Sequence, residues 1–167
     1  MGGREVLGER VRGAVLDVVR RPAVTRVLSH VLPGLDKAVR RVTGGRITSA
    51  AQAFLPTLVL RSTGARSGIE REHTLVYVRD ADGHLLLVGT NFGGDTHPAW
   101  TFNLLAHPDA TVEVDGRVER VRAERVAADE MPALWPRFDR VYAGFASYRE
   151  RIGGTREIRM FRLVAHP

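Results

Sequence analysis

Two acidic turn sequences, each lying between runs of β-branched and aliphatic residues, constrain most strongly how residues 56–164 can fold. Asp80-Ala81-Asp82-Gly83 and Asp115-Gly116 are typical of hairpin turns, because Asp and Gly tolerate the left-handed backbone that a tight turn requires. Each turn joins two runs with the composition of strands, so neighbouring strands run antiparallel. Strands are expected at residues 57–60, 74–78, 84–88, 111–114, 118–121 and 157–164.

Two segments of the same region have helical patterns and interrupt the strands. A short helix is predicted over residues 99–105, and a longer one over 129–151 begins near Asp129 with Pro132 in its first turn. Five or six short antiparallel strands in about 110 residues are too many for one flat sheet with polar faces. The pattern therefore predicts an α+β fold whose strands close into a small barrel.

The composition excludes several classes of protein. A chain of 167 residues with 44% hydrophobic and 26% charged residues has the composition of an ordinary folded protein. Because it contains no cysteine, it is not a disulfide scaffold, a thiol enzyme or a cysteine-ligated zinc protein. The longest uncharged run, residues 47–60, is too short to span a bilayer, and the charged start shows no secretion signal. We therefore expect a cytoplasmic protein.

The positive charge is concentrated near the N-terminus. Residues 1–46 contain ten basic and four acidic residues, which accounts for the whole net charge of +6. Apolar residues at helical spacing predict an amphipathic helix over residues 4–20 and one or two more helices before residue 46. We expect a helical, basic extension at residues 1–50 and the barrel domain at 51–167. The extension either contacts an anionic surface or is a solvated helical face.

Two loops carry residue types suited to ligand binding. Residues 63–68, Thr-Gly-Ala-Arg-Ser-Gly, suit an anion such as a phosphate, although an exposed hairpin would use the same residues. Residues 89–95 leave an apolar strand and precede Trp100, an arrangement that suits a planar ligand lying against the indole. Asn91 and Asn103 are then placed to bond the polar edge of that ligand. In the alternative, Trp100 belongs to the core and Asn103 is a local cap.

An aromatic triplet lies on the predicted helix at 129–151. Tyr142, Phe145 and Tyr148 are spaced three residues apart, so their rings share roughly one face. A phenol hydroxyl is a neutral donor near pH 7 and can meet a ligand, but an aromatic face of this kind also packs in protein cores. Small residues between the rings, among them Gly144, indicate that another group packs closely against this helix.

The six histidines do not form a metal-binding pattern. No two of them lie four residues apart, and none has a carboxylate at ligand spacing within a common helix or strand. The chain also lacks a Walker loop, a dinucleotide fingerprint and the Gly-x-Ser-x-Gly sequence of many serine hydrolases. We therefore expect neither a metal site nor serine-based hydrolysis.

Taken together, these motifs resemble the deazaflavin-dependent nitroreductase and quinone reductase family. Its members are split β-barrel proteins, of the FMN-binding and PNPOx-like type, that use coenzyme F420, an 8-hydroxy-5-deazaflavin. The resemblance covers residues 56–164 and rests on the order of three motifs. These are the loop at 63–68, the Gly-Gly pair at 93–94 followed by Pro-Ala-Trp at 98–100 and Asn-Leu-Leu-Ala-His-Pro at 103–108, and the aromatic triplet.

The resemblance implies a set of residues that bind the coenzyme. The first loop and the strand after it are expected to hold the phosphate and tail, and the next positions to line the deazaflavin pocket. The second loop and the short helix are expected to complete the contacts. The residues are Arg66, Ser67, Gly68 and Arg71 for the tail, His73 and Thr74 for the pocket, and Phe92, Gly93, Gly94, Trp100 and Asn103 for the further contacts.

The resemblance also implies hydride transfer from the reduced coenzyme to an electron-poor acceptor such as a quinone or a nitro compound. Tyr142, Tyr148 and Asn91 are the expected catalytic residues, with the tyrosines supplying the proton, and Phe145 is expected to contact the acceptor. Members that reduce nitroimidazoles carry a lysine where this chain has Phe92 and a tyrosine where it has Phe145. These departures argue against nitroimidazoles as acceptors.

Three other functions are open to a chain of this type. An FMN-dependent member of the same barrel class and a non-catalytic protein that binds deazaflavin or lipid are the main alternatives. Nucleic-acid binding is disfavoured, because residues 47–167 carry no net charge and show no basic face. In some relatives the N-terminal helix approaches the membrane. We therefore expect a small-molecule acceptor and peripheral contact of residues 1–46 with the inner face of the membrane.

Overall fold

The computed structural model describes residues 55–166. The helices predicted before residue 46 lie outside this range, and the domain boundary expected at residues 50 and 51 stays a prediction. Within the described range the strands are β1 (Thr57–Thr63), β2 (Glu70–Val76), β3 (Val78–Arg79), β4 (Leu85–Val88), β5 (Asp109–Val114), β6 (Arg117–Arg125) and β7 (Met160–Ala165). The helices are the single 3-10 turn η2 (Asn91–Gly93), α3 (Ala99–Ala106), α4 (Met131–Val141) and α5 (Gly144–Ile152).

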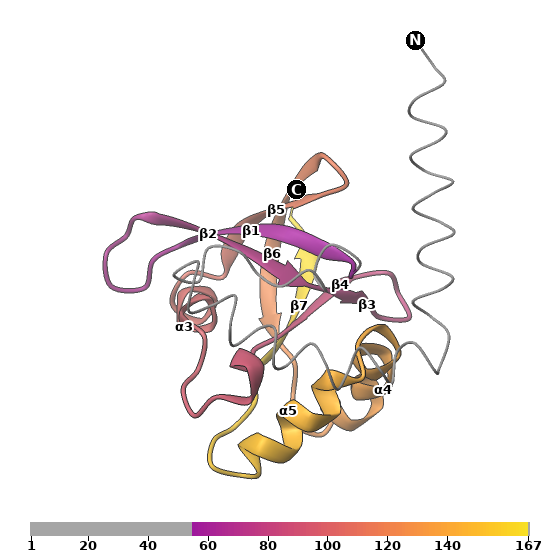
Figure 1. Ribbon diagram of the computed structural model, residues 1–167. Coiled ribbons are helices and arrows are strands. Elements are labelled where there is room, and N and C mark those ends of the chain that lie inside the picture. Colours follow the sequence, from indigo (N-terminus) through magenta and orange to yellow (C-terminus); the bar gives the residue numbers. More distant parts are fainter. Residues whose placement is uncertain (1–54, 167) are drawn as a thin grey trace, which may run out of the picture. The chain divides into compact units, whose positions relative to one another are not determined.

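The seven strands form one antiparallel sheet with the order β2-β1-β5-β6-β7-β4-β3. β2 and β3 are its two edges, yet only Tyr77 separates them in the chain. The sheet must therefore curl until its edges approach each other (Figure 1). The amide of Tyr77 donates to the carbonyl of Pro56, just before β1, at 3.1 Å. The predicted α+β fold with a barrel of antiparallel strands is confirmed, as a curled half-barrel.

All six predicted strands are present, but their bounds differ. Most of them are longer than predicted: β1 ends at Thr63 rather than at residue 60, and β6 ends at Arg125 rather than at residue 121. The run at 74–78 bends at Tyr77, so β2 and β3 replace one expected strand. The last strand begins at Met160 rather than at residue 157. The predicted hairpins are present between β1 and β2, β3 and β4, and β5 and β6. In the last of these, Asp115 and Gly116 have φ angles of 51° and 76°, the left-handed conformations that an Asp-Gly turn favours.

The sheet buries apolar side chains on both of its faces. An inner cluster inside the curl includes Trp100 and Leu104 from α3, and an outer cluster between the sheet and the helices α4 and α5 includes Phe138. The two helices lie side by side on that outer face (Figure 1). β4 is apolar throughout because it serves both clusters: Leu85 and Leu87 enter the first and Leu86 the second.

The long helix expected over 129–151 is in fact two helices. α4 ends before Tyr142, whose backbone is extended with φ −151° and ψ 109°, and α5 begins at Gly144. The Tyr142 ring lies so close to Gly144 that a Cβ atom there would collide with it. A group does pack closely against the small residues of this helix, as predicted, and that group is the ring of Tyr142. Among the described residues, no helix is both long enough and apolar enough to cross a membrane.

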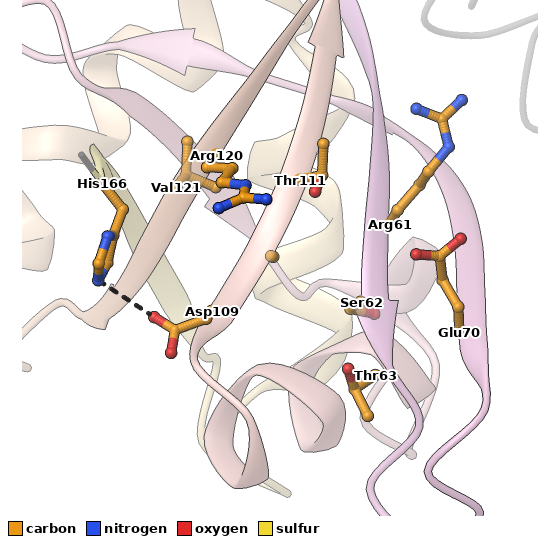
Figure 2. A pocket seen from close by; sticks show the side chains of 10 residues that line it. Arg61, Ser62, Thr63, Glu70, Asp109, Thr111, Arg120, Val121 and His166 are labelled. Carbon is orange, nitrogen blue, oxygen red and sulfur yellow. Dashed lines mark ion pairs between the residues drawn. The ribbon is translucent and has the colours of Figure 1, made fainter.

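Charged side chains line the outer surface of β1, β5 and β6, and Figure 2 shows several of them, with the Asp109–His166 pair as a dashed line. Arg61 on β1 donates to Glu113 on β5 at 2.9 Å. Asp109 on β5 pairs with Arg122 at 2.8 Å and with His166 at 3.9 Å. These strands surround a hollow of about 370 Å³. Exposed pairs of this type contribute little stability, and they keep this face of the sheet polar.

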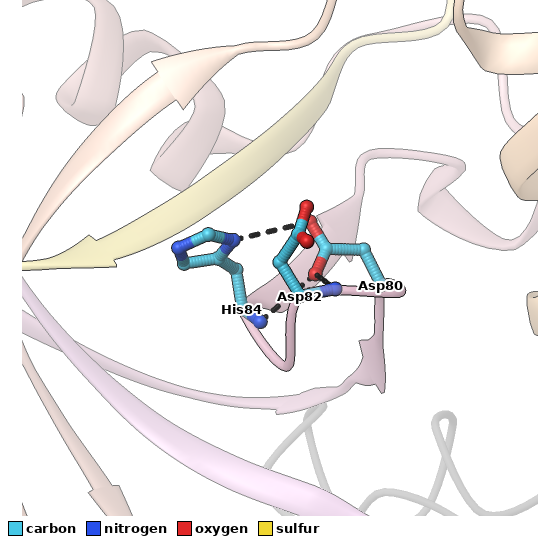
Figure 3. A group of neighbouring side chains, drawn as sticks. All are labelled: Asp80, Asp82 and His84. Atoms are coloured by element: carbon cyan, nitrogen blue, oxygen red, sulfur yellow. Dashed lines mark hydrogen bonds and ion pairs between the residues drawn. The ribbon is translucent and has the colours of Figure 1, made fainter.

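Asp80 anchors the turn between β3 and β4 (Figure 3). Its side chain is 5% exposed and accepts hydrogen bonds from the amides of Asp82 and His84, at 3.0 and 2.9 Å. The Nε atom of Arg162 on β7 donates to the same carboxylate at 2.9 Å. Burial alone raises the pKa of Asp80, but the bonds from Arg162 and from the two amides outweigh it, so the pKa lies below its ordinary value of 3.8.

Replacing Asp80 with asparagine should lower the free energy of unfolding at pH 7 by about 2–4 kcal/mol, because charge-assisted hydrogen bonds are lost around a buried group. The native carboxylate binds protons less readily than the unfolded one. Its contribution is therefore present above pH 3.8 and is lost as the pH falls below that value. Urea denaturation of both chains should show a difference that shrinks below pH 3.8. Asp129→Asn, at an exposed position, is the control; a difference that stays constant down to pH 3 would contradict this role of Asp80.

Candidate functional site

A cavity of about 570 Å³ lies between the β1–β2 hairpin and the start of α3. This volume is in the range of about 300–1,000 Å³ that is usual for sites that bind small molecules. The hairpin loop and β2 form one wall, and the segment that leads into α3 forms the other. Polar side chains from both walls line the cavity, namely Arg66, Ser67, Arg71, Glu72, His73, His97 and Asn103.

Asn103 on α3 holds the hairpin loop in place. Its side chain is buried, its Oδ1 atom accepts from the amide of Ala65 at 3.0 Å, and its Nδ2 atom donates to the Ser62 hydroxyl at 3.2 Å. Gly64 lets the loop turn tightly here, because a Cβ atom would come within 2.6 Å of the Ser67 hydroxyl. Asn103 is therefore a clamp between α3 and the hairpin, and not the local helix cap of the alternative interpretation.

The cavity wall formed by the hairpin is positively charged. Arg66 and Arg71 are exposed at its rim. Glu72 is the one carboxylate in the lining, and it accepts from Arg61 Nε at 3.1 Å, which offsets its charge. An anionic group near the rim would therefore meet two arginine side chains whose charge is not cancelled within the wall.

His73 on β2 faces the same cavity as a neutral imidazole. Burial, and then the charge of Arg71, lower the pKa of His73 below its ordinary value of 6.5, so the ring carries no charge at pH 7. Its Nδ1 atom is buried and has no hydrogen-bond partner within residues 55–166. A buried polar atom without a partner is costly, and a bound ligand that supplies the missing partner would remove that cost.

Arg156, from the loop before β7, supports the opposite wall. Its guanidinium donates to the carbonyls of Thr90, Gly89 and Gly94 at 2.7, 3.2 and 3.0 Å. It also lies 3.5 Å from Nδ1 of His97, the histidine that borders the cavity. One side chain thus ties together the whole segment between β4 and α3.

The η2 turn contains two residues in an unusual conformation. Asn91 and Phe92 have φ angles of 47° and 55°, in the left-handed region that costs a residue other than glycine about 1–3 kcal/mol. The side-chain Nδ2 atom of Asn91 donates to the backbone carbonyl of Thr96 at 3.1 Å, which closes the loop. The Phe92 ring stands edge-on to the ring of Tyr148 on α5, with centroids 6.1 Å apart. The turn therefore carries Phe92 towards the aromatic residues of α5.

The aromatic triplet comes together although its members belong to different elements. Tyr142 follows α4, whereas Phe145 and Tyr148 lie on α5. The hydroxyls of Tyr142 and Tyr148 are 3.4 Å apart, and the centroids of the Tyr142 and Phe145 rings are 5.7 Å apart. Phe145 and Tyr148 are each 6% exposed and belong to the outer core cluster, while Tyr142 is half-buried. Tyr142 is thus the most accessible ring of the three.

The structure divides the predicted site residues into two groups. Those that line the cavity are Arg66, Ser67, Arg71, His73 and Asn103. Phe92, Gly93 and Gly94 lie in or beside η2, which contacts α5 and its aromatic residues. Gly68 and Thr74 are exposed neighbours of the first group and do not line the cavity.

Trp100 belongs to neither group. Its side chain is 3% exposed and packs in the inner core, where its ring lies 5.6 Å from that of Phe161. The expectation that a planar ligand lies against this indole is therefore wrong, and the core alternative holds. α3 presents Phe102 to the cavity instead, with 46% of that residue exposed.

Sequence reasoning missed His97, Phe102 and Arg156. His97 and Phe102 lie on either side of Trp100, the residue on which the sequence argument concentrated. Residues two apart in a helix do not share a face, so a buried Trp100 would have indicated that Phe102 points in another direction. Arg156 had no local signal, since it is one of 24 arginines and its partners precede it by about 60 residues.

The turn between β3 and β4 brings three possible metal ligands together, Asp80, Asp82 and His84 (Figure 3). These residues lie on a turn, where spacing within one helix or strand does not predict which side chains meet. The Asp80 carboxylate, however, already accepts bonds from two amides and from Arg162. The cluster is explained by its role in holding the turn.

Comparison with known sequences relates this chain to a described family of reductases. The family model of the F420H(2)-dependent quinone reductases matches residues 35–162. The chain is 37% identical over 93 residues to an F420H(2)-dependent quinone reductase of Mycobacterium tuberculosis (strain ATCC 25618 / H37Rv) and to a putative one of Mycobacterium bovis. These matches cover 55% of this chain and 61% of each relative, so the chain spans less than two thirds of their length.

A solved structure supports the same assignment. The structure of an F420-H2 dependent reductase (FDR-A) superposes with a TM-score of 0.58 at 28% identity, and the match covers 65% of this chain and 93% of that one. The family model, in turn, spans the hairpin, α3, the aromatic residues and Arg156. This chain therefore belongs to the F420H(2)-dependent quinone reductase family.

Proposed function

We propose that this protein is an F420-dependent oxidoreductase, which transfers a hydride from reduced coenzyme F420 to an electron-poor acceptor such as a quinone. The observation that carries the proposal is the cavity itself, whose arginine-bearing hairpin faces a wall that carries His97, a neutral histidine, and the ring of Phe102. The family to which the chain belongs supports the choice of coenzyme. The alternatives are an FMN-dependent enzyme of the same barrel type and a non-catalytic protein that binds deazaflavin or lipid.

The residues of the cavity fit both ends of such a coenzyme. Arg66 and Arg71 at the rim suit a phosphate and an acidic tail. Further in, the unpartnered Nδ1 atom of His73 suits a polar edge of the ring system, and Phe102 offers an apolar surface to the ring itself. We propose that Ser67 and Gly68 complete the tail site, and that Thr74 lies beside the ring.

Bound F420 would supply the hydride chemistry, because a deazaflavin transfers a hydride from carbon and is a poor one-electron carrier. The task of the protein is then to bind the reactants, orient them and place a proton donor. The Asn103 clamp and the Arg156 bonds hold the two cavity walls without any ligand, which reduces the entropy lost on binding.

We propose that the acceptor binds beside η2 and α5. Phe92 is 39% exposed and lies against Tyr148, so an aromatic acceptor would find ring surfaces there together with the half-buried Tyr142. In this proposal Tyr142 and Tyr148, whose hydroxyls lie 3.4 Å apart, deliver the proton that balances the hydride. Phe145 packs behind them, Gly93 and Gly94 shape the turn, and Asn91 keeps it closed.

We also propose that the reaction takes place at the inner face of the cytoplasmic membrane. Residues 1–46 hold the whole net charge of +6, and a basic segment is attracted to anionic lipids by about 1 kcal/mol for each cation near the surface. A solvated helical face remains the alternative function of this segment.

The coenzyme and its site can be tested together. Fluorescence titration should show that the full chain binds F420 at least tenfold more tightly than FMN. Replacing Arg66 and Arg71 with alanine should weaken F420 binding by about 2–4 kcal/mol, because two partly exposed charge-assisted contacts are lost. Arg117→Ala with Arg140→Ala, at exposed positions outside the cavity, is the matched control. Unchanged titration curves for the first double variant would refute the tail site, and tighter binding of FMN would favour the FMN alternative.

The proton donors can be tested by removing single hydroxyls. Tyr142→Phe and Tyr148→Phe should each lower kcat/KM at least about tenfold with reduced F420 and a menadione-like quinone, because a positioned acid contributes about 10²–10⁴-fold. Tyr77→Phe, which changes the remaining tyrosine of the chain, is the control. Shifts in the melting temperature with unaltered rates would assign both residues to the core alone.

Membrane contact can be tested by co-sedimentation with vesicles. Replacing Arg10, Arg12 and Arg20 with glutamine should reduce binding to anionic vesicles at least about tenfold and leave binding to neutral vesicles unchanged. The control replaces Arg117, Arg120 and Arg140, which are exposed in the barrel domain. Equal retention of both triple variants would refute a specific role for residues 1–46.

A further inference from the structure

His97 occupies a position whose chemistry the proposed function does not yet use. It lies between η2 and α3, borders the 570 Å³ cavity, and stands edge-on to Phe102 with ring centroids 5.8 Å apart. On its other side lies the guanidinium of Arg156, with the terminal nitrogen Nη1 3.5 Å from Nδ1 of His97. The imidazole therefore separates a fixed cation from the ligand space.

Arg156 itself has little freedom to move. Its three nitrogens donate to four backbone carbonyls, at distances between 2.7 and 3.2 Å. Those carbonyls belong to Gly89, Thr90, Gly94 and Glu157. The donor that faces His97 is thus held by the backbone of two loops, and not by the imidazole.

The geometry decides which nitrogen of His97 carries the hydrogen. A guanidinium has only N–H donors and stays protonated, and both hydrogens of this nitrogen already point to the carbonyls of Gly89 and Glu157. The positive charge 3.5 Å away therefore favours an unprotonated Nδ1, whose lone pair faces Arg156. A neutral imidazole has one hydrogen, which is then on Nε2. A protonated ring would place an N–H directly against the N–H groups of Arg156.

The surroundings of His97 also oppose its protonation. Burial lowers the pKa of His97, and the charges of Arg159 and Arg156 lower it further, while Glu157 acts weakly in the opposite direction. Within the described residues, neither Arg156 nor Arg159 forms an ion pair with a carboxylate. The other charged or titratable groups near the ring are Arg125 and, across the cavity, Arg66, Arg71, Glu72 and His73.

We propose that His97 is a hydrogen-bond donor to the bound ligand, presenting Nε2–H to a carbonyl oxygen or ring nitrogen, and that Arg156 is the positioning residue that fixes this tautomer. The class of ligand, the polar edge of a deazaflavin, rests on the proposed function. With His73 on the facing wall, the cavity would hold that edge between two neutral imidazoles. A ligand with only donors at that edge would leave the Nε2–H group of His97 without an acceptor.

The tautomer can be tested without any ligand. In the full chain labelled with ¹⁵N-histidine, two-bond ¹H–¹⁵N spectra at pH 7 should show His97 with an unprotonated Nδ1 and a protonated Nε2. The signals are assigned by their loss in His97→Gln. Arg156→Gln should convert His97 to a mixture of tautomers, and Arg156→Met, which also removes the charge, replaces this variant if it does not fold. An Nδ1–H tautomer in the native chain, or an unchanged spectrum in the Arg156 variant, would overturn the role of Arg156.

The donor can then be tested by F420 titration followed by fluorescence. His97→Leu should weaken binding about tenfold, whereas His97→Gln, whose amide places an N–H near the position of Nε2, should restore most of the affinity. His107→Leu, at an exposed position beyond α3, is the control. Melting temperatures exclude a general loss of structure.

The two proposals fail in different ways. If the native chain does not bind F420, the proposed function and the ligand of His97 are both refuted. If the native chain binds F420 and His97→Leu binds it equally well, only the donor role of His97 is refuted.

Discussion

The arrangement of this molecule depends on one constraint, which is that the two edge strands of its sheet are consecutive in the chain. A single residue, Tyr77, joins β2 to β3, so the seven-stranded sheet must curl to bring its edges near each other. The curl creates a concave face that is filled by the inner cluster and a convex face that α4 and α5 cover in part. The hydrophobic effect then acts on both faces of strands such as β4, which makes the register of these strands strongly specified.

The candidate cavity lies outside both hydrophobic clusters, and polar contacts hold its walls. Asn103 joins α3 to the hairpin loop, and Arg156 joins the loop before β7 to the segment between β4 and α3. Each contact uses side-chain groups that satisfy backbone atoms of a distant loop. Such loops would otherwise be mobile, because they contribute few apolar side chains to a core. A preformed cavity of this kind loses less entropy when it binds a ligand.

Local signals predicted much of the fold and part of the site. The Asp-Gly turns and the alternating runs identified the hairpins, and the loop at 63–68 with Asn103 identified one wall of the cavity. The single helix over 129–151 was wrong because its helical spacing continues through Tyr142, and nothing local shows that this ring folds over Gly144. The three aromatic residues meet all the same, since the two helices pack against the same face of the sheet.

The sequence by itself determined the pairing of neighbouring strands, the charge of residues 1–46 and the family of the chain. These properties depend on which residues are present and on their order along the chain. The tertiary structure alone decided that Trp100 is buried while Phe102 faces the cavity, and that Arg156 reaches His97 from 59 residues away. The physical reason is that a buried polar atom must find a hydrogen-bond partner among the groups that the fold brings close to it. These groups can lie far apart in the chain, so residue spacing does not predict which of them will pair.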